Sequence, residues 1–348
     1  MLYLFSFILT SFFIILFSYL SPYLKLLDIP NKRKLHKGPV PLVGGIAIYL
    51  TVLIILPFVN FDFPLKIIVL SSGIILILGV LDDAFELGIL IRLISQLIAG
   101  LIVVGAGISI VDIGDYSYIK PIELGTLGIL LTIVSVMGLT NAINFIDGIN
   151  GLCAGLVLIA LIVLVYFVYL SGNTIDITLI KIISISIAVF LLVNIELTPI
   201  KKVFLGDAGS MVLGFILSWI LIYYSHPTTR YIHPILTIWC VPIPVFDLLG
   251  VIMRRIIRKI NPFKSDRRHI HHILIDLGIT PTKVFLIIVT VSIIISFIGG
   301  IVYFNFGPAP ALLAYFILFL VYVYISLLLS RKIHSLSKDD VAELQTKR

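Results

Sequence analysis

Two adjacent aspartates, Asp82 and Asp83, end a strongly apolar run that otherwise has the length and composition of a membrane-crossing helix. Carboxylates at the mouth of an apolar segment are costly to keep there, and two side by side repel each other. Acids at the carboxyl end of a helix also oppose the helix dipole, so a solvated helix end gives them no electrostatic gain. The pair therefore predicts a positive partner, and a divalent cation carrying a phosphorylated substrate is the simplest one.

A second polar segment, NAINFIDGING, carries amides and a carboxylate at helical spacing. Asn141, Asn144 and Asp147 are each three residues apart, so they share one face of a helix. Three polar side chains on one face of a membrane helix do not face lipid, which leaves hydrogen bonding to another helix or binding of a substrate or ion. Gly148 and Gly151 are predicted to end this helix just past the carboxylate.

Three further segments add charged groups. Asp207, in KVFLGDAGS, stands where a short loop enters a new helix, so it either caps that helix or ligates a metal. The segment DRRHIHH contains Arg267, Arg268, His269, His271 and His272. Zinc is one interpretation, but the arginines would oppose a cation, and Arg and His suit phosphate oxygens better. Lys37 lies in a proline- and glycine-rich loop, where it and the loop amides would hold an anion near a helix start.

The elements that must position these side chains are membrane helices. The chain has 348 residues, of which 60% are hydrophobic and 12% charged, against about 25% charged in soluble domains. The apolar runs are about 20 residues long and do not alternate as barrel strands do. We therefore expect an all-α polytopic membrane protein with about eleven transmembrane helices. The expected spans are 2–21, 42–60, 64–81, 92–111, 126–143, 152–171, 177–195, 209–226, 231–252, 283–304 and 309–330.

A single integral-membrane domain is expected over residues 1–330, followed by a polar cytoplasmic tail over 331–348. The first span lacks a basic start and a small-residue cleavage site, so we interpret it as a membrane helix rather than a signal peptide. Cys153 and Cys240 fall inside apolar runs and are expected to be small core residues. The formal net charge of +7 does not indicate nucleic-acid binding, because its distribution between the loops follows membrane orientation instead.

Basic residues divide unequally between the two sides of the predicted membrane. The poorer side holds Lys66, Lys120, Lys181 and Arg230. The richer side is cytoplasmic by the positive-inside rule, which places the amino terminus outside the cell (inner or plasma) membrane and the carboxyl tail in the cytoplasm. The five polar segments then share the cytoplasmic face, and we expect them to form one composite active site there.

Acids beside Lys, Arg and His at a membrane face predict metal-assisted phosphoryl chemistry on a lipid. Mg²⁺ takes carboxylate and phosphate oxygens and keeps water, so few protein ligands are needed, and Mn²⁺ is an alternative. An ion-coupled membrane transporter is a second hypothesis, but its acids should lie near the bilayer midplane in a repeated architecture. An intramembrane metalloprotease would need a closed zinc set on helices, whereas HIHH is predicted to lie on an arginine-rich loop.

In chain order, HKGPVPLVGG, LDD, NAINFIDGING, KVFLGDAGSM and DRRHIHH resemble the signatures of the polyprenyl-phosphate N-acetylhexosamine-1-phosphate transferases. The resemblance runs from residue 28 to about residue 275, and the motifs are specific in this order although each alone is weak. VFDLLGVIMRRIIRKINPFKSDRRHIHH is most similar to the bacterial undecaprenyl-phosphate GlcNAc-1-phosphate transferases. The phospho-MurNAc-pentapeptide transferases of peptidoglycan synthesis rank second, because their histidine segment is usually built differently.

This resemblance implies a reaction on lipid. UDP-N-acetylglucosamine (UDP-GlcNAc) would donate sugar-1-phosphate to undecaprenyl phosphate, giving undecaprenyl-pyrophosphoryl-GlcNAc and UMP. The product would enter a cell-surface polysaccharide such as O-antigen, common antigen or a teichoic acid linkage. Asp82 and Asp83 would lie nearest the reacting phosphates, as base or metal ligands, and Asp207 would be the favoured Mg²⁺ ligand. A homo-oligomer is compatible with this interpretation.

The resemblance also implies roles for the other polar residues. Asn141, Asn144 and Asp147 would position the nucleotide-sugar, with Asp147 in the catalytic set. The groups contacting phosphate or sugar would be Lys37, Arg267, Arg268, His269, His271 and His272, with His269 also catalytic. Many relatives carry DGIDG where this chain has Asn150. Asparagine keeps the size and an acceptor but loses the charge, so Asn150 is expected to hydrogen-bond substrate from outside the catalytic core.

Overall fold

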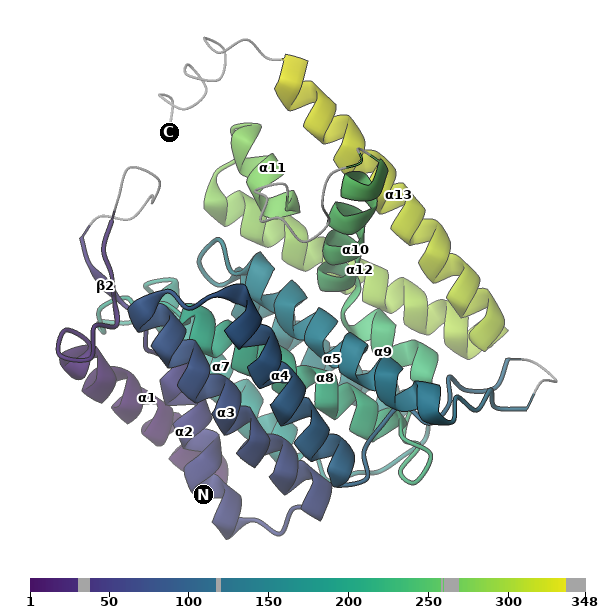
Figure 1. The fold of residues 1–348 in the computed structure, drawn as a ribbon, viewed down its shortest axis with the longest axis horizontal. Coiled ribbons are helices and arrows are strands. Elements are labelled where there is room, and N and C mark those ends of the chain that lie inside the picture. Colours follow the sequence, from purple (N-terminus) through teal and green to yellow (C-terminus); the bar gives the residue numbers. More distant parts are fainter. Residues whose placement is uncertain (31–37, 117–119, 258, 260–268, 336–348) are drawn as a thin grey trace.

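The fold was analysed in a computed structural model, which describes residues 1–30, 38–116, 120–257, 259 and 269–335. Over these residues the chain is a bundle of helices with one short antiparallel hairpin, β1 (Leu27–Asp28) with β2 (Val40–Pro41) (Figure 1). The first helices are α1 (Leu2–Leu20), α2 (Gly44–Ile55), the 3-10 turn η1 (Leu56–Phe58), α3 (Phe63–Phe85), α4 (Ile89–Gly105), α5 (Thr126–Ile146) and α6 (Leu152–Leu170). The remaining helices are α7 (Thr178–Asn194), α8 (Gly206–Ser225), α9 (Pro234–Cys240), α10 (Pro242–Ile257), α11 (Ile270–Asp276), α12 (Pro281–Phe306) and α13 (Pro308–Ser335).

The all-α polytopic prediction is confirmed. Among the described residues, 7 helices are long and apolar enough to cross a membrane, or up to 8 if the bent pair α9–α10 counts as one span. Shorter apolar helices, α2 with η1, α4 and α7, occupy three more of the predicted spans. The count of eleven therefore stays a prediction, because a short helix crosses about 30 Å of hydrocarbon only with help from its neighbours.

Helix α8 lies at the centre of the bundle, and 94% of the residues in its apolar stretch are buried. Its amino-terminal turn is packed so tightly that side chains would not fit. A Cβ added to Gly45 of α2 would lie 2.1 Å from the Cα of Gly209, and one added to Gly79 of α3 would lie 2.3 Å from the Cα of Ala208. The glycines of the VGG and GDAGS motifs are thus explained by backbone approach, which fixes where α8 begins.

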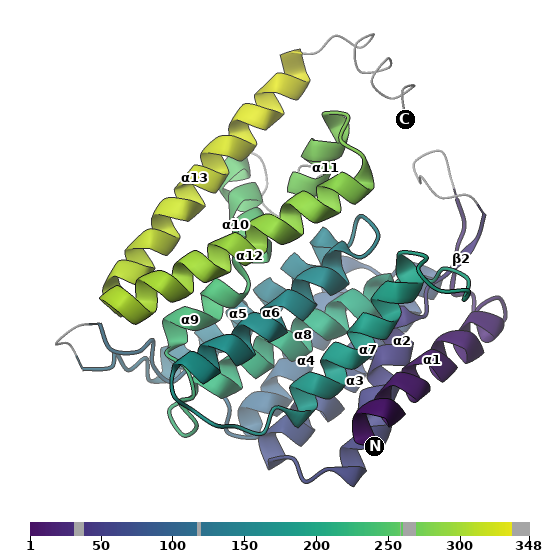
Figure 2. The same cartoon turned by 180° about the vertical axis from the view of Figure 1, so that it is seen from behind.

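The carboxyl-terminal third of the chain forms a separate layer on this bundle. Helices α9 and α10 meet at an angle of 84° at Val241, and α12 and α13 form a V in front of α10 in Figure 2. The sequence predicts one span over 231–252 and gives no indication of this bend. Helix α13 continues to Ser335, so the first residues of the predicted tail are helical, and 336–348 lie outside the described residues.

Candidate active site

Four aspartates from three helices gather at one end of the bundle. Asp82 and Asp83 lie in the last turn of α3, Asp147 directly follows α5, and Asp207 lies in the first turn of α8. Helices α3 and α5 both pack against α8, and their carboxyl ends meet its amino end (Figure 1). The predicted convergence of the DD, NAINFIDG and GDAGS segments at one face of the molecule is therefore observed.

Asp83 joins α3 to the start of α8. Its Oδ1 accepts a hydrogen bond from the backbone N–H of Asp207 at 2.8 Å, and its Oδ2 accepts one from Ala208 at 3.1 Å. These N–H groups have no partner within their own helix, and the positive end of the helix dipole favours a carboxylate there. The carboxylate that caps α8 is therefore Asp83, whereas the sequence had offered Asp207 for that role. Asp207 makes no side-chain cap.

The side chain of Asp82 forms an ion pair with Arg92, a residue that the sequence analysis did not single out. Its Oδ1 accepts a hydrogen bond from the N–H of Leu87 at 2.7 Å, and its Oδ2 lies 2.9 Å from Arg92 Nε. Arg92 also reaches Asp207, with 3.3 Å between Nη1 and Oδ2. Arg92 begins the predicted span 92–111 and is its only basic residue, and a lone charge in an apolar helix was the signal that could have revealed it.

The two asparagines of α5 have different partners. Asn144 Nδ2 donates to Asp207 Oδ1 at 3.0 Å and to Ser210 Oγ at 2.8 Å, so it orients the carboxylate of Asp207. Asn141 Nδ2 donates to Gln96 Oε1 of α4 at 2.8 Å. Both asparagines line the same cavity.

Asp147 is the acid without a partner. Its carboxylate accepts no hydrogen bond from any residue that the structure describes. Burial of this carboxyl group, together with the nearby charges of Asp207 and Asp83, raises its pKa to about 8. Helix α5 ends at Ile146 and Gly151 adopts a positive φ of 75°, so the predicted break after this residue is confirmed. Asn150 lies exposed on the loop that follows.

The histidine segment is partly helical, which corrects the expectation of a loop. His269 is the N-cap residue of α11, and His271 and His272 lie in its first turn. His269 Nδ1 lies 2.7 Å from Asp247 Oδ2 of α10. Asp247 Oδ1 in turn accepts hydrogen bonds from the N–H of Ile270 at 3.0 Å and from Tyr322 Oη at 2.8 Å.

Asp247 and Tyr322 were not singled out from the sequence, although a lone acid in the apolar run VFDLL was visible there. An imidazole held through Nδ1 by a buried carboxylate has a fixed orientation, which leaves its other nitrogen for a ligand. The ring of His269 lines the cavity described below.

His271 and His272 differ in what they face. His271 is fully buried, and a Cβ added to Gly148 would lie 2.2 Å from its Nε2, so its ring packs directly on the backbone that follows Asp147. Neither ring nitrogen has a hydrogen-bond partner among the residues that the structure describes. Burial lowers the pKa of His271 to about 3, so the ring is neutral. His272 lines the cavity.

One cavity of about 1110 Å³ begins at this polar cluster and runs along α4, α5, α8 and α10. At the end near the acids it is lined by Arg92, Asn144, Arg255, His269 and His272. Most of its wall is apolar, with leucine, isoleucine and valine side chains. At the far end of α8 it reaches Asp112, Tyr116 and His226.

The predicted phosphate contacts Lys37, Arg267 and Arg268 lie outside the described residues. Within the described ranges, no three His, Cys, Asp or Glu side chains are close enough to hold a metal ion by themselves. That finding concerns only sites formed by three or more protein side chains. It is compatible with Mg²⁺, which needs only one or two carboxylates when substrate phosphates complete its shell.

Residues 65–225 match the sequence profile of the glycosyl transferase family 4. The undecaprenyl-phosphate alpha-N-acetylglucosaminyl 1-phosphate transferase of Escherichia coli O157:H7 is 31% identical over 324 residues, which cover 91% of this chain and 88% of that protein. The chain belongs to glycosyl transferase family 4. The enzyme of the same name from Haemophilus influenzae is 32% identical over 312 residues, covering 88% of this chain and 87% of that protein.

The part of the chain that matches the family profile runs from α3 through α8. It therefore contains all four aspartates, Arg92 and both asparagines, but not His269, Asp247 or Tyr322. The glycosyl transferase family 4 profile and the acid cluster thus coincide, while the histidine segment comes from the layer packed on the bundle. The similarity to the two named enzymes extends over that layer as well, since it covers most of the chain.

Proposed function

We propose that this protein transfers N-acetylglucosamine-1-phosphate from UDP-GlcNAc to undecaprenyl phosphate, giving undecaprenyl-pyrophosphoryl-GlcNAc and UMP. The names of the similar enzymes from Escherichia coli and Haemophilus influenzae support the sugar and the acceptor. The choice of UDP as the donor's nucleotide rests on chemical grounds. A UDP-sugar releases UMP, which is an anionic leaving group, and the basic residues at the site would neutralise its charge.

The observation that carries the proposal is the single cavity that joins a polar cluster to a long apolar wall. A polyprenyl phosphate has one charged end and a long hydrocarbon chain, so its acceptor site must provide both surfaces at once. The cavity provides Arg92 and His269 at one end and aliphatic side chains along its length. An ion pathway would be expected to keep polar groups at intervals across the bundle, whereas the four acids here share one end.

The chemistry requires positioning and charge neutralisation more than a strong base, because the acceptor phosphate is already anionic. One of its oxygens forms a bond to the phosphorus that carries the sugar. The bond from that phosphorus to the oxygen of the uridine phosphate breaks, and UMP leaves with that electron pair. Arg92 offers positive charge between Asp82 and Asp207, and His269, oriented by Asp247, faces the same space.

Mg²⁺, or Mn²⁺ as an alternative, would be held by carboxylates of this cluster and would supply positive charge to the phosphates of the donor. The donor set of the site fits such an ion. The side chain of Asp207 is 43% exposed, so its carboxylate is accessible, and the carboxylate of Asp147 accepts no hydrogen bond from the described residues, so both of its oxygens are free of such partners. Asp82 has one oxygen beside Arg92, and both oxygens of Asp83 already accept backbone hydrogen bonds. Asp207 and Asp147 would therefore hold the ion, with Asp82 next in availability.

The cellular setting forms part of the same proposal. The charge distribution supports an inner or plasma membrane protein with its active site and carboxyl terminus in the cytoplasm and its amino terminus outside. UDP-sugars are soluble, so a donor site at the cytoplasmic face is consistent with the substrate. The downstream polysaccharide and a homo-oligomeric state stay predictions.

Transfer activity is tested with purified protein, undecaprenyl phosphate and UDP-GlcNAc labelled in the sugar. We expect label in the lipid phase and one equivalent of UMP, both abolished by EDTA and restored by Mg²⁺. Asp207→Asn should lose at least about 100-fold in turnover. Glu196→Gln is the matched control, because Glu196 makes only an exposed ion pair with Lys202, and it should retain activity.

Competing donors separate the rival functions. Transfer from UDP-MurNAc-pentapeptide in preference to UDP-GlcNAc would favour the phospho-MurNAc-pentapeptide transferase interpretation. Movement of a solute across proteoliposomes without UMP formation would favour a transporter. Normal turnover by folded Asp207→Asn would overturn the metal assignment.

A further inference from the structure

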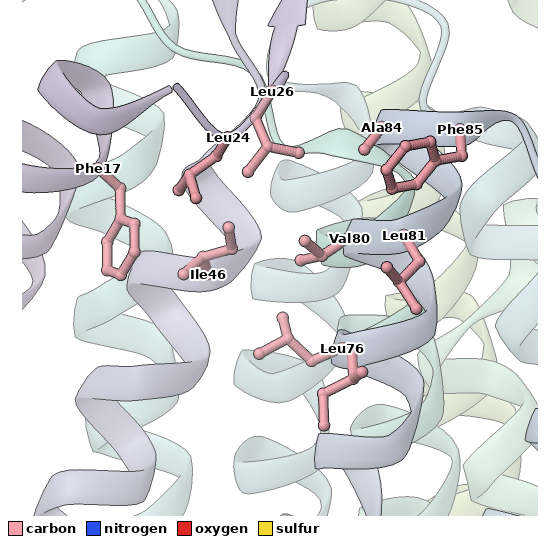
Figure 3. Close-up of a pocket in the computed structure, with 10 residues that line it drawn as sticks. Phe17, Leu24, Leu26, Ile46, Leu76, Val80, Leu81, Ala84 and Phe85 are labelled. Atoms are coloured by element: carbon pink, nitrogen blue, oxygen red, sulfur yellow. The ribbon is translucent and has the colours of Figure 1, made fainter. Parts of the chain in front are cut away.

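A second, smaller cavity lies against α3 (Figure 3), whereas no residue of α3 lines the cavity of about 1110 Å³. Its volume is about 330 Å³, and all ten side chains that line it are apolar. They come from the end of α1, the turn before β1, the start of α2 and the last turns of α3. Figure 3 shows Val80, Leu81, Ala84 and Phe85 of α3 on one side of this groove and Phe17, Leu24, Leu26 and Ile46 on the other.

This apolar groove backs onto the acid cluster. Val80, Leu81, Ala84 and Phe85 belong to the same two turns of α3 that carry Asp82 and Asp83 on their other side. The opposite wall is also connected to the site. Leu26 is completely buried, and its carbonyl accepts a hydrogen bond from the N–H of Leu42, which forms a bridge to Phe204 just before α8. An occupant of the groove would therefore contact both segments that position the carboxylates.

The mouth of the groove carries a positive charge. Lys25 lies next to Leu24 and Leu26 in the lining, and its Nζ lies 5.5 Å from the centre of the Phe85 ring. No carboxylate among the described residues lies within ion-pair distance of this ammonium group. Lys25 also adopts a positive φ of 59°, which is strained for a residue with a side chain, and the backbone hydrogen bond from Leu26 to Ser21 closes the turn around it.

We propose that this groove binds one acyl chain of an anionic phospholipid whose headgroup pairs with Lys25. An all-apolar groove of this size suits a hydrocarbon chain, and an exposed lysine at its mouth selects a negatively charged headgroup over a zwitterionic one. The bound lipid stabilises the last turns of α3 against the start of α2, and through them the arrangement of Asp82, Asp83 and Asp207. It acts as a lipid activator whose site is separate from the acceptor site.

Two other occupants are less compatible with the groove. The polyprenyl acceptor has its own cavity, which contains Arg92 and His269, while the groove behind α3 contains no polar side chain. A second copy of the chain would need to insert an apolar side chain from its own lipid-facing surface. It would leave the charge of Lys25 without a partner.

Binding is measured with a fluorescent reporter in the groove. The two native tryptophans, Trp219 and Trp239, are 0% exposed, so Phe85→Trp adds an accessible indole at the mouth. The variant is placed in bicelles that contain phosphatidylglycerol or phosphatidylcholine with the same brominated acyl chains. We expect half-maximal bromine quenching of this tryptophan at about a five-fold lower mole fraction of phosphatidylglycerol than of phosphatidylcholine. One lysine near a lipid surface provides a preference of about this size for anionic lipid.

The lysines offer a matched control pair. Lys25→Gln in the Phe85→Trp background should reduce quenching by phosphatidylglycerol to the level seen with phosphatidylcholine. Lys181→Gln should leave it unchanged, because Lys181 also lies over an aromatic ring, at 5.4 Å from the centre of the Tyr3 ring, but neither residue lines this groove. In the otherwise unaltered protein, phosphatidylglycerol should raise turnover several-fold, and Lys25→Gln should remove that increase.

Equal quenching by the two lipids, or full phosphatidylglycerol preference in Lys25→Gln, would overturn the proposal. Displacement of the brominated lipid by polyprenyl phosphate would also overturn it and would assign the groove to the acceptor. Loss of lipid quenching when the protein dimerises would overturn it as well and would assign the groove to a second copy of the chain. The turnover measurement rests on the proposed transferase function, whereas the quenching measurement does not. Lipid-selective quenching without any transfer would therefore refute the function and keep the site.

Discussion

The cavity of about 1110 Å³ has charged side chains at both ends, but the two ends differ in how those charges are paired. At the far end Asp112 has a partner for each oxygen, with Arg230 Nη2 at 2.6 Å and the N–H of Gly114 at 2.8 Å. At the near end Arg92 lies beside Asp82 and Asp207, Arg255 and His269 also line the cavity, and Asp147 accepts no hydrogen bond from the described residues. Among the described residues, the acid at the far end therefore has a partner for each oxygen, whereas Asp147 at the near end has a partner for neither.

This difference separates a structural ion pair from a binding site. Buried charges that are fully paired stabilise a turn and need nothing else. A carboxylate without a partner is costly for the fold, and such groups are typical of sites where a ligand supplies positive charge. The contrast therefore favours the near end as the binding site without reference to any relative.

The largest effect should come from making the same substitution at both ends. Arg92→Met removes the described base of the acid cluster, and we expect turnover to fall by about 100-fold or more. Arg230→Met should keep turnover within about two-fold but destabilise the protein by about 1–3 kcal/mol, because Asp112 is left buried and unpaired. Turnover and thermal unfolding in detergent are measured for both. Equal losses of turnover would remove the distinction between the two ends.

A smaller effect is expected where His271 packs on the loop that carries Asp147. Gly148→Ala places a methyl group against the ring, so either the ring or the loop must move, and we expect turnover to fall about 10- to 100-fold. The double variant Gly148→Ala/His271→Ala removes the imidazole ring that the new methyl group would contact, so it should recover part of that loss. A double variant no more active than Gly148→Ala would show that His271 does not position Asp147.

The unpaired state of Asp147 predicts an unusual dependence of stability on pH. Its pKa is about 8 in the folded protein against a usual value near 3.8, so the folded state binds the proton more tightly than the unfolded state does. Stability contributed by this group is present at low pH and is lost as the pH rises from about 4 to about 8. Asp147→Asn should therefore raise the unfolding temperature by a few degrees at pH 9 in EDTA, and change it little at pH 4.

The control for this measurement has the opposite sign. The ion pair with Lys202 lowers the pKa of Glu196, so Glu196→Gln removes a small stabilisation that is present at high pH and lost in acid. Its effect should be slight, because the pair is exposed. An Asp147→Asn variant that is less stable than the unaltered protein at pH 9 would show that the Asp147 carboxylate has a stabilising partner, which would contradict the interpretation of this group.

The smallest effect is expected from Tyr322→Phe. This change removes one hydrogen bond to Asp247, at 2.8 Å, and leaves the contact between Asp247 and His269 intact. A hydrogen bond to a charged group is worth about 1.5–3 kcal/mol, but Asp247 keeps its hydrogen bond from Ile270 and its contact with His269, so turnover should fall by about ten-fold or less. Asp247→Asn should have a larger effect, because it also removes the charge that orients the imidazole. The ratio of the two losses, measured across pH, tests whether Asp247 acts through His269.

The sequence predicted which residues form the acid cluster but not how they are held. Asp82, Asp83, Asp147 and Asp207 follow from polar groups at the ends of apolar runs, since alternating helix directions bring such ends to one membrane face. The partners were not predictable in the same way. Asp83 turned out to cap α8 from another helix, and its neighbour Asp82 turned out to bind Arg92, because those contacts depend on helix rotation and approach.

The bend between α9 and α10 shows the same limit. Its apolar composition predicted one span over 231–252, and composition is insensitive to an 84° change in direction. That bend, with α11 and α13 beside α10, brings Asp247 and Tyr322 together with His269. The histidine segment could therefore be predicted as part of the candidate site from its residues, but its supporting contacts could not.

The amino-acid sequence alone determined the class of this protein, the helical segments and the chemical character of its active site, because hydrocarbon forces apolar runs into helices and leaves charged groups only at their ends. The tertiary structure decided which acids are paired and which stays open, where the acyl-sized spaces lie, and that α3 presents carboxylates on one side and an apolar groove on the other. Those properties depend on contacts a few ångströms long between residues far apart in the chain. The spacing of residues along one chain does not specify such contacts.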